Sequence, residues 1–166
     1  MKRIHRYLCR HFSRLERLGK WSFLWRSWLE AVVIAYIIGE VLQGVFPAGP
    51  RSDLESLPLV QLVALVAVIG PLFETVAFQC LPLELTAALG FRRAARSIIS
   101  IVPFALMHQF AGVPTIVAAG IVGGFYFAFT YERWRKESLV VGVLMTFLLH
   151  SSYNLVGVLG MLFLHK

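Results

Sequence analysis

The stretch LPLVQLVALVAVIGPLFETVAFQC, residues 57–80, decides the class of this protein, because a helix needs about 20 mostly apolar residues to span a bilayer. The composition of the whole chain agrees with it. Of the 166 residues, 58% are apolar and 15% are charged, and the mean hydropathy is +0.72. A water-soluble domain carries about 45–50% apolar and about 25% charged residues, and a disordered chain has low hydrophobicity. Both classes are therefore excluded, and we predict an integral membrane protein.

Four more apolar stretches are candidates for membrane spans. They are residues 28–46, 97–110, 113–131 and 139–164, of which 97–110 is short. The sequence thus predicts an all-α fold, a polytopic integral membrane helix bundle of about five transmembrane helices. Residues 57–89 as one helix would measure about 48 Å, which exceeds the roughly 30 Å of a bilayer core. We therefore expect a break near Pro82, with residues 83–89 at the membrane interface.

The basic residues are distributed unevenly among the loops. Fourteen of the 16 Lys and Arg residues precede the first span or follow the second or the fourth, and the other two are Arg51 and Lys166. Positive charges are enriched on the cytoplasmic side of membrane proteins. The N-terminus is therefore predicted in the cytoplasm and the C-terminus outside, which agrees with an odd number of spans. Because the membrane accounts for the net charge of +7, we expect no nucleic acid partner.

Residues 1–26 form a basic segment that precedes the transmembrane domain, residues 27–166. Between residues 2 and 20, apolar residues alternate at helical spacing with arginines at positions 3, 6, 10, 14 and 17. This pattern predicts an amphipathic helix whose basic face binds the anionic inner leaflet of the lipid bilayer. Trp21, Trp25 and Trp28 follow where an aromatic headgroup belt is expected. A basic retention signal without another role explains the segment equally well.

Ionisable residues inside spanning helices are costly and by default indicate a functional site. Counted from the cytoplasmic end at 1.5 Å per residue, His108 lies roughly 16 Å and His150 roughly 18 Å deep. Glu74 lies roughly 12 Å deep if its helix ends near Pro82, and deeper if the helix continues. Three costly side chains from three helices at similar depth predict one convergent polar site near the middle of the membrane. Glu30, which lies close to the basic segment, is expected to pair with Arg26 one helical turn earlier.

The side chains at this depth are sufficient for peptide hydrolysis. A carboxylate beside an imidazole can take a proton from water and return it to a leaving amine. A second imidazole with a carboxamide one turn away, as in His150 and Asn154, can donate hydrogen bonds to an oxyanion. Two alternatives remain: the polar side chains only bond the helices together, or His108 and His150 hold a haem.

Three motifs in order on separate helices resemble those of a known family. They are Phe73-Glu74-Thr75-Val76-Ala77-Phe78-Gln79, then Phe104-Ala105-Leu106-Met107-His108, then His150-Ser151-Ser152-Tyr153-Asn154. They resemble the E-E-x-x-x-R, F-x-x-x-H and H-x-x-x-N/D patterns of the CPBP family. These are the CAAX-processing and bacteriocin-processing intramembrane proteases, also called the Abi family. The resemblance covers a core of residues 58–160.

The resemblance implies a glutamate-dependent hydrolase, an intramembrane endopeptidase in a bacterial cytoplasmic membrane. Its implied catalytic residues are a carboxylate, two imidazoles and a carboxamide: Glu74, His108, His150 and Asn154. Glu74 matches the base that activates water, and His108 matches its partner. His150 and Asn154 match the pair that stabilises the oxyanion. The substrate would be a membrane-associated peptide or protein.

These four residues require no cofactor. Catalytic zinc usually has three firm protein ligands, and the chain has only two cysteines, which do not form a Cys-x-x-Cys pair. We therefore predict that the site needs no metal, with zinc as the less favoured alternative.

The first motif departs from the family pattern at two positions. Thr75 stands where the second glutamate is expected, and Gln79 stands where the arginine is expected. Both positions of the family's charge pair thus hold neutral residues in this chain, so neither position leaves an unpaired buried charge at the other. Together with Phe78 and Phe104, these two residues are predicted to surround the site. The double change fits a working site with rebuilt surroundings. It also fits an inactive enzyme, kept as a subunit that binds or stabilises a larger membrane protein complex.

Overall fold

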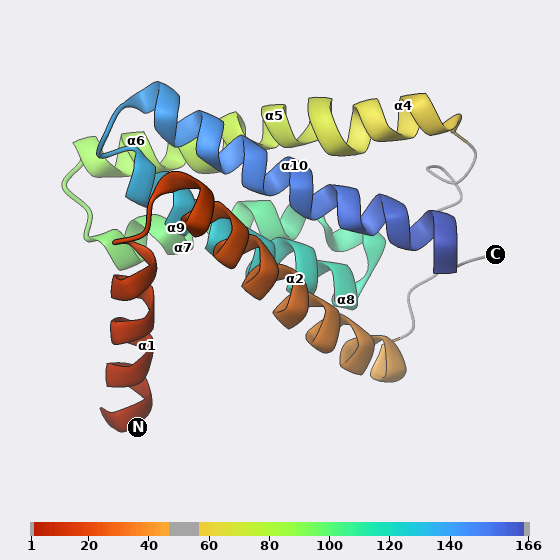
Figure 1. Cartoon of the computed structure of the whole chain (residues 1–166), viewed down its shortest axis with the longest axis horizontal. Coiled ribbons are helices and arrows are strands. Elements are labelled where there is room, and N and C mark those ends of the chain that lie inside the picture. The colour runs from red at the N-terminus through yellow and green to blue at the C-terminus, as the bar shows by residue number, and fades with distance from the viewer. Residues whose placement is uncertain (1, 47–56, 165–166) are drawn as a thin grey trace.

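The computed structural model describes residues 2–46 and 57–164, and the elements in these ranges are helices (Figure 1). The N-terminal part consists of α1, Lys2–Leu15, and α2, Lys20–Val45. In Figure 1, α1 runs crosswise to the other helices at one end of the bundle, whereas α2 extends toward the opposite end. Arg51 and Lys166, the two basic residues predicted on the outer side, lie outside the described residues.

The second predicted span is one continuous helix, Leu59–Ala88, so the break expected at Pro82 is wrong. Along it follow α4 (Leu59–Val63), the π-helical η1 (Ala64–Ile69), α5 (Gly70–Glu74), the π-helical η2 (Thr75–Cys80) and α6 (Leu81–Ala88). Proline lacks an N–H donor and clashes with the preceding turn of an α-helix. Pro71 and Pro82 each stand at the start of an α-helical segment that directly follows a π-helical one. At this change of hydrogen-bond pattern the missing donor costs least, and the helix continues.

The chain then forms a short helix followed by two long ones. The elements are α7 (Arg93–Met107), the 3₁₀ turn η3 (Gln109–Ala111), α8 (Val113–Thr115), the π-helical η4 (Ile116–Gly123), α9 (Gly124–Trp134) and α10 (Leu139–Leu164). Gly112 adopts φ +88°, a conformation that glycine tolerates, between η3 and α8. In Figure 1, α7 and the helix that follows it run side by side.

In the described part of the chain, four helices are long and apolar enough to cross a membrane: α2, Leu59–Ala88, Val113–Trp134 and α10. The third predicted span is α7, which has 15 residues and measures about 22 Å. It is shorter than a bilayer core and ends at the turn around His108. The predicted polytopic membrane helix bundle is therefore confirmed, with four long helices and one short one.

Glycines let α7 approach η4 and α9 closely. A Cβ added to Gly120 would lie 2.5 Å from the Cα of Ala105, and one added to Gly124 would lie 2.9 Å from Cδ1 of Phe104. Backbone contact through small residues is how membrane helices often pack, because lipid supplies no hydrophobic driving force between them. This contact sets the position of Phe104 and of the turn at His108 that follows it.

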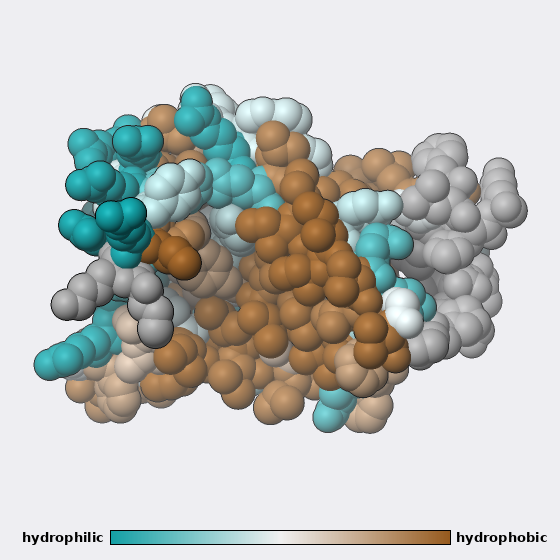
Figure 2. Space-filling model, turned by 90° about the horizontal axis from the view of Figure 1, so that it is seen from below, coloured by the Kyte–Doolittle hydropathy of each residue, from teal (hydrophilic) through white to brown (hydrophobic). Residues whose placement is uncertain are grey.

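The basic loops and α1 gather at one end of the bundle, called the basic end below. Glu16, just after α1, lies 2.6 Å from Arg93 and 3.7 Å from Lys136, while Lys20 lies 2.8 Å from Glu137. Figure 2 shows hydrophilic side chains at this end and apolar ones over the middle of the face in view. The N-terminal segment and the two basic loops thus lie together, as their predicted location on one side of the membrane requires.

Glu30 does not pair with Arg26 as expected. Its Oε2 lies 2.9 Å from Nε2 of His11 and accepts a hydrogen bond from the hydroxyl of Tyr126 at 3.1 Å. Arg26 is exposed on α2, whereas Glu30 faces the neighbouring helices. The carboxylate therefore connects α1 and α9 to α2.

Candidate active site

The candidate site lies where the middle of the helix Leu59–Ala88 meets α10. Oε2 of Glu74, the last residue of α5, lies 3.3 Å from Nε2 of His150 on α10. Oγ1 of Thr75 lies 3.4 Å from the other ring nitrogen of His150, Nδ1. Because an ionised carboxylate only accepts hydrogen bonds, Nε2–H of a neutral His150 donates to Glu74, and the Thr75 hydroxyl donates to Nδ1. The two neighbours thus select one tautomer of the imidazole.

Aromatic rings hold His150 in place. Its side chain is only 1% exposed, and the imidazole stacks on the ring of Phe127 with centroids 4.1 Å apart. The ring of Phe104 meets it edge-on at 5.6 Å. The Glu74 side chain, by contrast, is 33% exposed. A fixed interior imidazole therefore holds a carboxylate that can be reached from outside the bundle.

His108 lies close to this pair without contacting Glu74 directly. Nδ1 of His108 lies 2.9 Å from the carbonyl oxygen of Phe104, so the Nδ1–H donates and Nε2 carries the lone pair of the neutral ring. The two rings also meet edge-on, with centroids 4.9 Å apart. The same Phe104 ring also meets the imidazole of His150 edge-on, so it contacts both histidines. All three ionisable residues are thus brought together, but the group in contact with Glu74 is His150, whereas the expected partner is His108.

Asn154 is used differently from the expectation. It lies one helical turn after His150, and its Nδ2 donates to the carbonyl oxygen of Val66 at 3.0 Å. Val66 belongs to η1, so the carboxamide connects α10 to the first π-helical segment. In this arrangement one of the two N–H donors of the Asn154 amide is used by the backbone.

The residues predicted to surround the site lie in the interior, at or beside it. Thr75 and Gln79 are both 0% exposed, and Thr75 contacts His150 as described above. Phe78 packs on Phe104 with centroids 5.8 Å apart. In the described part of the chain, Oε1 and Nε2 of Gln79 have no hydrogen-bond partner. A buried amide without partners is costly, so Gln79 is a point of strain next to the site.

Two contributors were missed by the sequence patterns. Phe127, which stacks on His150, belongs to a span that carries no ionisable residue in its middle. Val66, which receives the Asn154 donor, contributes only its backbone, which no sequence pattern reveals. The one available signal was the pair Gly123-Gly124 just before the aromatic run that contains Phe127, since small residues mark close helix packing.

A metal centre finds little support in this geometry. Among the described residues, no group of three or more His, Cys, Asp or Glu side chains is placed to hold a metal ion. Catalytic zinc usually takes three protein ligands, whereas one carboxylate and one imidazole are in contact here. Both imidazoles also pack against the ring of Phe104, which occupies space that a haem between them would need.

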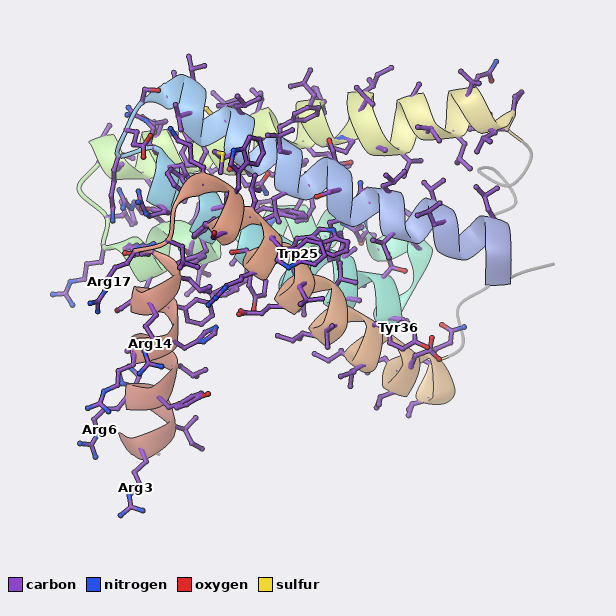
Figure 3. The ribbon with its side chains drawn as sticks, in the orientation of Figure 1. Arg3, Arg6, Arg14, Arg17, Trp25 and Tyr36 are labelled. Atoms are coloured by element: carbon purple, nitrogen blue, oxygen red, sulfur yellow. The ribbon has the colours of Figure 1, made fainter. Side chains whose placement is uncertain are left out.

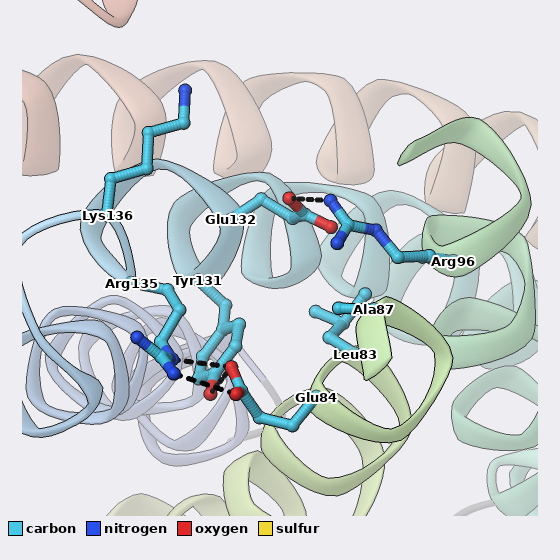
Figure 4. A pocket seen from close by; sticks show the side chains of 8 residues that line it. All are labelled: Leu83, Glu84, Ala87, Arg96, Tyr131, Glu132, Arg135 and Lys136. Atoms are coloured by element: carbon cyan, nitrogen blue, oxygen red, sulfur yellow. Dashed lines mark hydrogen bonds and ion pairs between the residues drawn. The ribbon is translucent and has the colours of Figure 1, made fainter. Parts of the chain in front are cut away.

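A second polar cluster lies at the basic end, around a cavity of about 300 Å³ (Figure 4). Arg135 donates to the two carboxylate oxygens of Glu84 at 2.6 and 2.9 Å, and Tyr131 donates to the same carboxylate at 2.9 Å. Nη2 of Arg96 donates to Glu132 at 2.7 Å. None of the four predicted catalytic residues lines this cavity. These ion pairs join the ends of α6, α7 and α9.

Comparison with known proteins identifies the family of this chain. Residues 56–156, which include all four predicted catalytic residues, match a family described as type II CAAX prenyl endopeptidase Rce1-like. The helices and the matched core define an intramembrane protease of the class that the motifs indicated. The chain belongs to the type II CAAX prenyl endopeptidase Rce1-like family, and the resemblance to CPBP proteases is confirmed. No curated protein and no solved structure gives a significant match.

Proposed function

We propose that this protein is a glutamate-dependent intramembrane endopeptidase that cleaves a membrane-associated peptide or protein. The observation that carries the proposal is the contact between Glu74 and His150 at 3.3 Å, midway along two membrane-spanning helices. Placing a carboxylate at this depth in a membrane costs free energy, and the partner of this one is an imidazole that can be neutral. Membership of an endopeptidase family supports hydrolysis as the use of this pair.

Glu74 acts as the base in this proposal. His150 donates to Oε2, which leaves Oε1 to accept a proton from a water molecule. The water oxygen then attacks the carbonyl carbon of the scissile peptide bond and forms a tetrahedral intermediate. Glu74 returns the proton to the amide nitrogen, the C–N bond breaks, and a carboxylic acid and an amine leave. No cofactor is needed for this sequence of steps.

The oxyanion of the intermediate needs hydrogen-bond donors. Nδ1–H of His108 is held by the carbonyl oxygen of Phe104, so a proton taken up by this ring resides on Nε2. Nε2–H is then one donor to the oxyanion. Asn154 is the second donor, through the N–H of its amide that does not bind the carbonyl of Val66.

The test uses the purified protein in proteoliposomes with a library of membrane-tethered peptides, prenylated ones included, and mass spectrometry to detect cleavage. Glu74→Gln should lower the rate of cleavage by about 10²-fold or more, because it removes the base. The matched control is Glu84→Gln, which changes a carboxylate on the same continuous helix outside the site. Cleavage by Glu74→Gln at the unmodified rate contradicts the mechanism.

A specific observation favours a second candidate, an inactive family member that serves as a subunit of a larger membrane protein complex. The Asn154 donor is already bound to Val66, and Thr75 and Gln79 replace the charged residues of the first motif. In this case no peptide of the library is cleaved, and the protein co-purifies with larger membrane proteins in fixed ratio. A monodisperse, cleaving protein excludes this candidate.

A further inference from the structure

The helix α1 carries two different faces that its own bundle leaves uncovered. Five arginines recur every three or four residues and form one stripe: Arg3, Arg6, Arg10, Arg14 and Arg17. The four labelled in Figure 3 (Arg3, Arg6, Arg14 and Arg17) point away from the bundle. On the apolar side, Ile4 is 68%, Tyr7 is 70% and Leu8 is 47% exposed. An exposed apolar stripe beside a row of cations requires a partner with both kinds of surface.

In the second half of α1, the apolar stripe is buried against the bundle. Phe12, one turn after Leu8, meets the rings of Phe125 and Phe129 edge-on at 5.2 and 5.1 Å. Leu15 is 3% exposed in the same core. The end of α1 is therefore anchored to the bundle, and its first two turns project beyond it (Figure 1).

The anchor lies at the level where membrane headgroups are expected. The carbonyl oxygen of Glu16 accepts a hydrogen bond from Nε of Arg133 at 2.6 Å, and its carboxylate contacts Arg93 in another loop of the basic end. Trp21 and Trp25, at the start of α2, are 77% and 61% exposed, as in an interfacial aromatic belt. At this level α1 runs crosswise to the spanning helices (Figure 1), which is the direction expected of a helix that lies along a membrane surface.

We propose that α1 is an interfacial helix that binds the phosphate headgroups of an anionic leaflet through its arginine stripe, with Ile4 and Leu8 inserted at the acyl boundary. Charge complementarity selects this occupant. No carboxylate in the described part of the chain pairs with Arg10 or Arg14, and the stripe is the most concentrated row of cations in the sequence. Polybasic segments beside a membrane span are attracted to anionic lipids in this way. The proposal also assigns the basic end to the cytoplasmic leaflet, and it does not depend on catalysis.

The test uses the full-length protein and its own thiol. Cys9 is exposed on α1 beside the arginine stripe, and Cys80→Ser leaves it as the single cysteine of the chain. We label Cys9 with an environment-sensitive fluorophore and reconstitute the protein in vesicles of phosphatidylcholine with increasing fractions of phosphatidylglycerol. The emission should shift to shorter wavelength as phosphatidylglycerol increases, and high salt should reverse the shift.

A pair of variants separates the arginine stripe from net charge. Each arginine near an anionic surface contributes about fivefold to binding, so Arg10→Gln/Arg14→Gln should weaken docking about 25-fold. The matched control, Arg26→Gln/Arg92→Gln, removes two exposed charges outside α1 and should leave the emission shift unchanged. If the emission wavelength is the same in vesicles with and without phosphatidylglycerol, the proposal is overturned. A shift that depends on protein density rather than on lipid charge overturns it in favour of a second copy of this chain.

Discussion

The carboxylates at the basic end and the carboxylate at mid-depth have partners of different kinds. Glu84 and Glu132 each accept a hydrogen bond from a guanidinium, at 2.6 and 2.7 Å. Among the residues that the structure describes, the ion-pair partner of Glu74 is the imidazole of His150, at 3.3 Å. Arginine stays protonated, so the first two pairs are permanently compensated and serve to hold helices together. Histidine can be neutral, so the pair of Glu74 and His150 is not permanently compensated, which fits the role of base proposed above for Glu74.

The largest expected effect comes from replacing Glu74 and His150 together by apolar side chains. Glu74→Leu/His150→Phe leaves neither member of the pair as an unpaired buried charge, so the midpoint of thermal unfolding in detergent should fall only by the loss of the hydrogen bond from Thr75 to His150. Hydrolysis in proteoliposomes should fall by about 10²-fold or more, because the base is lost. A double variant that keeps the activity would show that the pair at mid-depth is structural, like the pairs at the basic end.

At the basic end, replacing both members of an ion pair should cost little stability, whereas replacing one member should cost more. Arg96→Met leaves the Glu132 carboxylate, which is 8% exposed, without its nearest cation and should lower the free energy of unfolding by about 3 kcal/mol. Adding Glu132→Met should restore most of this loss, since removing both charges of a buried pair is often neutral. Thermal unfolding in detergent measures both variants. No recovery in the double variant would mean that this ion pair has a role beyond joining helices.

The helix α7 connects the two clusters, because it carries Arg96 near its start and ends at His108. Gly120→Ala places a Cβ against the backbone of Ala105 and should destabilise the protein by about 2 kcal/mol. The displaced α7 should also reduce hydrolysis. Gly157→Ala is the control, since a Cβ there meets no atom within 4 Å, and it should leave both measurements unchanged or raise stability slightly. Equal effects of the two substitutions would contradict the close contact.

The smallest effect is expected at the exposed pair of the basic end. The side chain of Glu84 is 36% exposed, compared with 8% for Glu132. Exposed ion pairs contribute about 0–1 kcal/mol, so Glu84→Gln should change the free energy of unfolding by less than about 1 kcal/mol. The change should shrink further at high salt. A loss as large as that of Arg96→Met would show that burial does not separate the two pairs.

Depth in the membrane was predictable from the sequence, but direction around the helix was not. Glu74, His108 and His150 come together because a helix rises regularly, which places residues at a given depth whatever their neighbours. Which imidazole contacts Glu74 depends on rotation about the helix axis. Glu74 lies between two π-helical segments, η1 and η2, where the rotation per residue differs from that of an α-helix. In the structure the imidazole in contact with Glu74 is that of His150, whereas the expected partner is His108.

The end of the second span was mispredicted for a related reason. Pro82 was expected to end its helix, because an α-helical pattern leaves no place for proline in the interior. The change from a π-helical to an α-helical segment supplies such a place. The apolar stretch 97–110 was correctly recognised as short. Its role as the helix α7, which ends at mid-depth, followed only from the packing of Ala105 on Gly120.

The π-helical segments also bear on how the gene can tolerate insertions and deletions. A hydrogen bond from residue i to i+5 encloses one residue more than a bond from i to i+4. Loss of one codon within Ala64–Ile69 can thus be absorbed by a return to the α-helical pattern, with the residues on both sides keeping their faces. In α2, which is α-helical throughout, the same loss would turn every following residue by about 100°. The helix that carries Glu74 contains two such segments, η1 and η2, so chain length can change there with less disturbance of the bundle than in α2.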